Sequence, residues 1–272
     1  MFLSTSRYDV LFQGEFDEGK VTVNLDLDAK PRFTKRQQEE IDRHWNDMLR
    51  KGWKMRPDPL YRLINFSVRN GILALHLGLT DYKEYMGTNV SHPEWSLEYG
   101  EKTMSNALSI SAVTETKNEK IIIERRSQNV GEDRGYYHTK PSGHPHPSEG
   151  IFGGVYSQAR KELGIEKSEI AKVACIGLVR SVRSHKPELM FKMKSRIAST
   201  DIERRPKEEA WEFDELLYLP KDPAFLAKWL IENFKKTVSL GHGTLLIYGF
   251  QNFGTEWLGE VRKGLISKKT DL

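Results

Sequence analysis

The sequence predicts a mixed α/β protein, because strand-like and helix-like patterns alternate along it. VTVNLDLD, at residues 21–28, alternates apolar and polar positions as a strand does. Residues 34–53, TKRQQEEIDRHWNDMLRKGW, instead place apolar side chains three and four apart, as on a helix. ACIGLV, at residues 174–179, is typical of a strand buried on both faces. With 272 residues, the chain can bury one large core or two modest ones.

Composition excludes several classes of protein. The 38% of hydrophobic and 29% of charged residues are ordinary for a folded protein, so disorder throughout is not expected. A net charge of +4 makes no case for nucleic-acid or membrane binding. The single cysteine, Cys175, sits in an apolar run and is predicted to be a buried thiol. No apolar run is long enough to cross a bilayer, and MFLSTSRYDVLF lacks the apolar core of a secretory signal, so we expect a cytoplasmic protein.

The first third predicts a helix followed by a hairpin. Thr34 can cap the helix and Gly52 can end it, and the apolar stripe is expected to face a core. That stripe consists of Ile41, Trp45, Met48 and Leu49. LYRLINFSVRNGILALHLGLT then predicts two strands joined at Asn70-Gly71, the strongest short hairpin signal.

The stretch LGLTDYKEYMGTN, at residues 77–89, has two interpretations. Thr80 or Asp81 can cap a short helix through Tyr82. Its polar turn could hydrogen-bond a sugar or phosphate oxygen, or could simply be a strand-to-helix corner that needs small residues. The turn consists of Gly87, Thr88 and Asn89.

The remaining elements follow a Pro-containing segment, SHPEWSLEYG, at which we place a boundary between residues 1–95, an amino-terminal extension, and 96–272. Strands are predicted in ALSISAVTET, IIIERRS, KVACIGLVRSV, ELMFKMKSRIA and LLYL. DPAFLAKWLIENFKKTV predicts a helix, whereas TLLIYGF fits either a strand or a buried helix. The helix should pack through Phe225, Leu226, Trp229, Leu230 and Phe234.

The segment from Gly143 to Ile165 has the most informative spacing. It follows the frame GX5EX7REUXEEXGU without insertion or deletion. The frame starts at Gly143, has its first glutamate at Glu149, and ends in Glu162, Leu163, Gly164 and Ile165. In that frame, carboxylates three and four apart on a helix can hold divalent cations against a pyrophosphate. Here the REUXEE positions read SQARKE, so only Glu162 is acidic, and Lys161 puts positive charge where a metal ion is expected.

Other charged clusters could complete such a site. Arg125 and Arg126 follow the strand IIIE, and Arg183 lies in a basic loop that could contact phosphate or only solvent. Glu209 and Glu212, just before LLYL, could supply a base or a metal ligand, or could keep a surface strand soluble.

Together these stretches resemble the Nudix superfamily, in the branch of animal UDP-glucose and UDP-galactose diphosphatases and related plant nucleotide-sugar hydrolases. The resemblance rests on LGLTDYKEYMGTN, IIIERRSQNV with SGHPHP, the box frame, and IGLVRSVRSHKPELMF. It implies an α/β/α sandwich with a mixed sheet. It also implies cleavage of a nucleoside diphosphate sugar, dependent on Mg²⁺ or Mn²⁺, to a nucleoside monophosphate and a sugar phosphate.

The resemblance also implies site residues. The catalytic candidates are Glu162, Glu212 and Glu209, and the metal candidates are Glu162, Gln158, Glu149 and Glu212. Substrate would be bound by Thr80, Asp81, Tyr82, Gly87, Thr88, Asn89, Arg125, Arg126, Gly143, His144 and Arg183. The lost carboxylates leave an alternative, a nucleotide-sugar-binding or scaffold protein with a protein partner, in which Lys161 replaces the cation.

Overall fold

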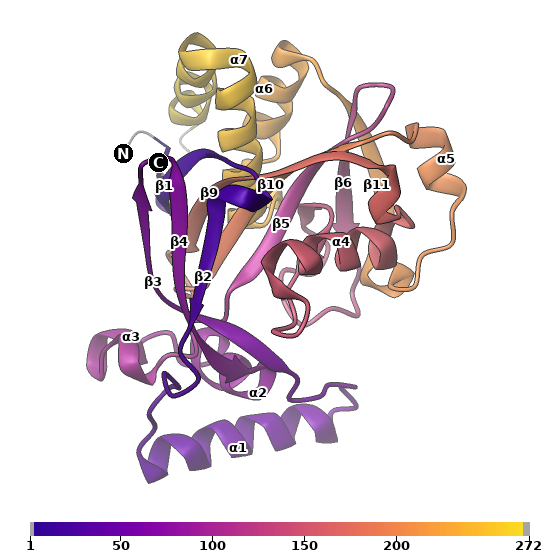
Figure 1. Cartoon of the computed structure of the whole chain (residues 1–272). Coiled ribbons are helices and arrows are strands. Elements are labelled where there is room, and N and C mark those ends of the chain that lie inside the picture. Colours follow the sequence, from indigo (N-terminus) through magenta and orange to yellow (C-terminus); the bar gives the residue numbers. More distant parts are fainter. Residues whose placement is uncertain (1–2, 269–272) are drawn as a thin grey trace.

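A mixed sheet of eight strands organises residues 3–268, the part of the chain that this computed structural model describes (Figure 1). The strand order is β1-β9-β10-β5-β6-β11, with β7 beside β6 and β8 beside β5. Its strands are β1 (Tyr8–Phe16), β5 (Ser109–Glu115), β6 (Lys120–Arg126), β7 (Tyr137–Thr139), β8 (Ser142–Gly143), β9 (Ile170–Ser181), β10 (Pro187–Ser195) and β11 (Phe213–Pro220). Because β10 runs parallel to β5 and antiparallel to β9, the sheet is mixed and the predicted mixed α/β class is confirmed.

A smaller sheet contains β2 (Val21–Leu25), β4 (Ile72–Asp81) and β3 (Pro59–Arg69), in that order. The predicted hairpin is confirmed, since β3 and β4 pair antiparallel around Asn70-Gly71. Both turn residues have positive φ angles, 51° and 74°, which Asn and Gly tolerate best.

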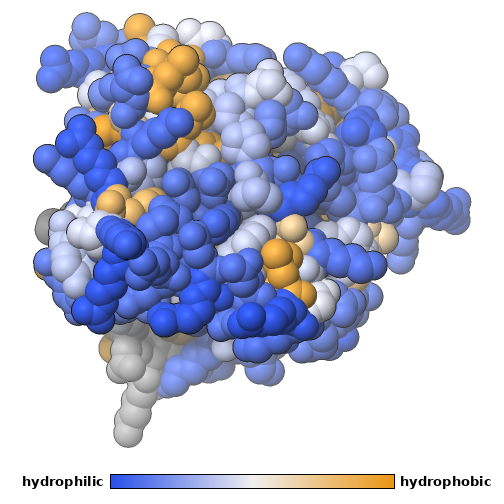
Figure 2. All heavy atoms as spheres, turned by 90° about the horizontal axis from the view of Figure 1, so that it is seen from below, coloured by the Kyte–Doolittle hydropathy of each residue, from blue (hydrophilic) through white to orange (hydrophobic). Residues whose placement is uncertain are grey.

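The first helix, α1 (Lys35–Arg50), forms as its sequence predicts. Thr34 closes a capping box with Gln37, and Gly52 follows the helix with a φ of 87°. One member of the predicted stripe is wrong, because Leu49 is 41% exposed and lies beside the buried face rather than on it. Figure 2, viewed from the α1 side, shows a largely hydrophilic surface with small apolar patches.

The other helices are α2 (Tyr82–Tyr85), α3 (Trp95–Glu98), α4 (Gly150–Leu163), α5 (Ser199–Arg204), α6 (Pro223–Glu232) and α7 (Ser239–Ser267). A π-helical turn, Met86–Val90, continues α2, and Gly254 kinks α7. The segment TLLIYGF is therefore a buried helix. In α6, Phe225 is 42% exposed, unlike the other members of its predicted stripe. The buried face of this helix begins at the next residue, Leu226.

The two faces of the large sheet are covered differently (Figure 1). One face packs against α6 and α7, through side chains such as Trp229 and Leu245. The other packs against α4 and the small sheet, through side chains such as Phe152 and Leu75. Cys175 lies in this second core, where burial raises the pKa of its thiol to about 12, as expected of a structural cysteine.

The segment 1–95 does not form one separate layer. β1 pairs with β9 inside the large sheet, whereas β2, β3 and β4 build the small sheet. Among the described residues, no helix is both long and apolar enough to span a bilayer.

Candidate functional site

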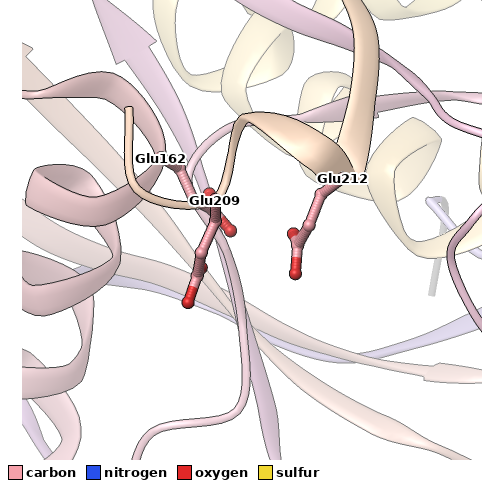
Figure 3. Close-up of side chains that lie close together, drawn as sticks. All are labelled: Glu162, Glu209 and Glu212. Carbon is pink, nitrogen blue, oxygen red and sulfur yellow. The ribbon is translucent and has the colours of Figure 1, made fainter. Parts of the chain in front are cut away.

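A cleft of about 440 Å³ brings together α4, β8 with the loop that follows it, and the loop before β11. Three carboxylates meet in it, Glu162 from α4 and Glu209 and Glu212 from the loop before β11 (Figure 3). One oxygen of each lies within 4.8 Å of the others. Glu162 thus shares one small acidic region with two carboxylates that lie 47 and 50 positions further along the sequence.

Close packing of the loop on α4 creates this arrangement. A Cβ at Gly154 would lie 2.5 Å from the Cβ of Pro145, and one at Gly143 would lie 3.0 Å from the Gln158 amide nitrogen. Gly164, with a φ of 66°, ends α4 directly after Glu162 and Leu163. The glycines of the box therefore allow the loop to approach the helix.

A buried lysine, Lys140, contacts the acidic cluster. Its Nζ lies 2.9 Å from Glu162 Oε1, 3.1 Å from Glu124 Oε2 and 3.2 Å from Glu212 Oε2, and the side chain is fully buried. Burial alone would lower the pKa of Lys140, but the three carboxylates outweigh it and raise the pKa. Lys140 is therefore a permanent cation at this site.

Burial also shifts the pKa values of the carboxylates. Burial raises the pKa of Glu162 to about 8, against the opposing charge of Lys140. Its Oε2 accepts a hydrogen bond of 2.9 Å from the Ser142 backbone N–H. Burial also raises the pKa of Glu124, which lies 3.3 Å from Arg126 Nη1. The pKa of Glu209 is likewise raised by burial and then by the charge of Glu212.

Sequence reasoning missed Lys140 and Glu124, and its choice of cation needs correction. Lys161, the residue it singled out, lies 3.7 Å from Glu209 and is partly exposed. The ammonium group that contacts Glu162 is that of Lys140. The available signals were weak. Lys140 directly precedes the loop that opens the box, and Glu124 is a charged residue at the end of the apolar run III.

Eight of the predicted site residues line this cleft: Tyr82, Arg126, Gly143, His144, Gln158, Glu162, Glu209 and Glu212. His144 packs against Tyr85 and Tyr82, with ring centroids 5.2 and 6.2 Å away. Burial and then the charge of Lys186 lower its pKa to about 3, so this imidazole is neutral. Gln158 Oε1 is buried without a hydrogen bond inside the described chain.

The other predicted residues do not line the cleft. Thr80, Asp81, Gly87, Thr88 and Asn89 belong to a corner, residues 77–89, where their polar groups are used internally. Thr80 bonds Glu84, and Asp81 caps the Glu84 N–H. Thr88 accepts from the Ser105 N–H, and a Cβ at Gly87 would lie 2.7 Å from Ile41. Asn89 donates to the Ser184 carbonyl at 2.8 Å.

Three charged candidates also lie elsewhere. Glu149 is exposed just before α4. Arg125 is exposed and pairs with Glu215 at 3.2 Å, on the neighbouring strand. Arg183 lines a different cavity, whereas Lys186 of the same loop does line the cleft.

The donor set fits a divalent cation. Glu162, Glu209 and Glu212 offer the oxygen ligands that Mg²⁺ and Mn²⁺ prefer. The buried, unpaired oxygen of Gln158 adds a neutral donor on the same cleft. Lys140 and Lys161 neutralise part of the negative charge, so the cluster offers less charge to a metal than a set of free carboxylates would.

The comparisons with known proteins point to one superfamily. No family model matches the chain. Nudix hydrolase 9 of Arabidopsis thaliana is 32% identical over 163 residues, which are 48% of this chain and 52% of that protein. The uridine diphosphate glucose pyrophosphatase NUDT22 of Mus musculus is 35% identical over 91 residues, 30% of this chain and 29% of that protein. The matches thus span about half of the first relative and less of the second.

The solved structures that the chain matches include the NUDIX domain of Shewanella oneidensis NrtR complexed with ADP ribose, with a TM-score of 0.40 and 13% identity. That match covers 60% of this chain and 97% of the NrtR domain. The MutT protein of Methanosarcina mazei Go1 gives a TM-score of 0.37 and 18% identity, over 54% of this chain and 94% of that one.

The intact box frame, the loop-on-helix geometry and the two sequence relatives lead to one assignment. They support assignment of the chain to the Nudix superfamily.

Proposed function

We propose that this chain hydrolyses the pyrophosphate of a nucleoside diphosphate sugar, giving a nucleoside monophosphate and a sugar 1-phosphate. The observation that carries the proposal is the meeting of Glu162, Glu209 and Glu212 within 4.8 Å in a cleft that basic side chains also line. The similarity to NUDT22, a uridine diphosphate glucose pyrophosphatase, supports a UDP-sugar as the first substrate to test.

A divalent cation, Mg²⁺ or Mn²⁺, bound by these oxygens would shield the phosphate charge and lower the pKa of a water molecule. The protein positions the ligands. The Ser142 N–H and Lys140 hold Glu162 in place, and Lys140 also fixes Glu212 at 3.2 Å. The cluster is therefore preorganised before substrate enters.

Basic side chains on the cleft give the phosphates a place to bind. Lys54, Arg126 and Lys186 all line it. Arg126 is held by Glu124 and by the Glu132 carbonyl, which its Nε contacts at 3.2 Å. Charge-assisted donors of this kind are the usual ligands of phosphate oxygens. Phosphate groups would then lie between these cations and the three carboxylates.

Glu209 is the best candidate for the general base. Burial raises its pKa, and thus shifts it in the direction of the working pH, where a general base is most effective. It is half-buried and lines the cleft beside Glu162, so a water held at the cluster would be within its reach.

The direct test is product analysis. The full chain is incubated with UDP-glucose, UDP-galactose and GDP-sugars in Mg²⁺ or Mn²⁺, and products are separated by ion-exchange chromatography. We expect a nucleoside monophosphate and a sugar 1-phosphate in equal amounts, lost on adding EDTA. Absence of both products across the panel would reject the proposal.

A second candidate function is binding of a nucleotide sugar without hydrolysis, and Lys140 favours it. Its buried ammonium already supplies one positive charge to Glu124, Glu162 and Glu212, which is a charge a cation would otherwise bring. In that case calorimetry would show nucleotide-sugar binding that is equally tight in EDTA and in Mg²⁺, with no turnover. Affinity that requires the metal ion would exclude this candidate.

A further inference from the structure

A second cavity, of about 760 Å³, adjoins the cleft and differs from it in character. Three aromatic side chains line it, Trp53, Tyr82 and Trp211. The two cavities share Lys54, Met55, Tyr82, Gly131 and Trp211, so they lie side by side. We call the second one the aromatic cavity.

Trp211 presents its indole at the junction. It is 56% exposed, which is unusual for so large an apolar side chain. Its backbone is fixed, since Ser127 Oγ donates to the Trp211 carbonyl and the Ser127 N–H donates to the Glu212 carbonyl, both at 2.8 Å. The backbone that carries the exposed ring is therefore held next to the acidic cluster.

The other walls combine a second aromatic face with polar groups. Trp53 is covered by the Arg134 guanidinium, 4.7 Å from the ring centroid. The exposed amides of Gln128 and Asn129 add hydrogen-bond donors and acceptors. The Tyr82 hydroxyl lies 3.4 Å from where a Cβ of Gly131 would be. Flat apolar surface and amide groups together suit a planar heterocycle.

We propose that the aromatic cavity binds the nucleobase of the substrate, stacked on Trp211, with the amides of Gln128 and Asn129 facing its polar edge. This inference rests on the proposed function, because it takes the pyrophosphate to lie at the acidic cluster. The nucleoside then extends past Tyr82 and Gly131 into the aromatic cavity, and the sugar phosphate lies on the other side of the cluster.

The test measures how much the nucleobase contributes to binding, separately from the phosphate. Calorimetry in Mg²⁺ gives the affinities of uridine and guanosine 5′-monophosphates and of ribose 5-phosphate, which has the same phosphate but no base. The wild-type protein should bind at least one nucleotide roughly tenfold more tightly than ribose 5-phosphate, since stacking on an aromatic ring contributes about that much. Trp211→Ala should remove most of this difference, and Trp211→Phe should keep most of it.

Tyr99→Ala is the matched control, because Tyr99 is another exposed aromatic, at 54%, and lines neither cavity. It should leave all three affinities unchanged. The inference is overturned if Trp211→Ala keeps the wild-type difference, or if the wild-type protein shows none. If either result is found while the protein still hydrolyses a nucleotide sugar, only the assignment of the nucleobase to the aromatic cavity is rejected. If no nucleotide sugar is hydrolysed, the proposed function itself is rejected.

Discussion

The corner at residues 77–89 and the box at residues 143–165 are both rich in small and polar residues, yet the structure uses them differently. In the corner, Thr88 and Asn89 are fully buried and bond to neighbouring segments. In the box, Glu162 is nearly as buried, but its carboxylate adjoins a cleft and a cluster of like charges. What separates the two segments is that Glu162 borders a cleft and lies beside other carboxylates, whereas the buried polar groups of the corner contact only the fold.

The largest expected effect comes from removing the positive charge of Lys140. Lys140→Met removes the cation from three carboxylates, and breaking a buried ion pair in this way should lower the free energy of unfolding by about 3–5 kcal/mol. Mn²⁺ should restore part of this loss by replacing the missing charge. Urea unfolding with and without Mn²⁺ measures both effects.

Lys140→Arg, which keeps the charge, is the control for that experiment and should lose less stability. If Mn²⁺ stabilises Lys140→Met no more than the wild-type protein, the ammonium and the metal ion do not act on the same carboxylates.

The next effect compares two glutamates of the box. Glu162→Gln should lower kcat for nucleotide-sugar hydrolysis by roughly 100-fold or more, because it removes a ligand charge from the cluster. Glu149→Gln should change kcat little, since Glu149 is exposed and does not line the cleft. Steady-state kinetics in Mg²⁺ measures both, and equal losses in the two variants would contradict this distinction.

A smaller effect is expected in the corner. Gly87→Ala would place a Cβ 2.7 Å from Ile41, and such overpacking should cost about 1–3 kcal/mol of stability with kcat unchanged. Gly259→Ala is the matched control, because its Cβ would meet nothing within 4 Å. Thermal unfolding and kinetics together test the pair. A change in kcat for Gly87→Ala, with stability intact, would assign the corner a role in the reaction.

The smallest expected effect is the pH dependence of stability that His144 causes. This residue lies where the corner and the box meet. Its folded pKa of about 3 lies below the unfolded value of about 6.5, so between these values the unfolded chain takes up a proton that the native protein does not. Stability should fall as pH drops through this range, by at most about 1.4 kcal/mol per pH unit from this group. Urea midpoints at pH 7 and pH 5 should therefore lie closer together in His144→Leu than in wild type. Equal spacing would show that His144 is not held neutral.

The sequence predicted most of the fold because local patterns control it. The hairpin at Asn70-Gly71, the cap at Thr34 and the frame from Gly143 to Ile165 are all readable without tertiary information. It also named Glu162, Glu209 and Glu212, which the fold brings together. The contacts of Lys140 could not be predicted in the same way, since they join β6, α4 and the loop before β11, and no periodicity marks a buried lysine.

The choice between a substrate-binding turn and a structural corner was open for the same reason. Whether Thr88 bonds a ligand or Ser105 depends on which segment packs beside it, and those residues are 17 positions apart in the sequence. Local spacing does not contain that information.

The role of the three carboxylates as a metal site can be checked by locating a bound ion. Crystals of the full chain soaked in Mn²⁺ should show an anomalous scattering peak among the carboxylates of Glu162, Glu209 and Glu212, with Lys140 still in contact with Glu124. No peak at saturating Mn²⁺, or a peak only at exposed carboxylates such as Glu149, would contradict it.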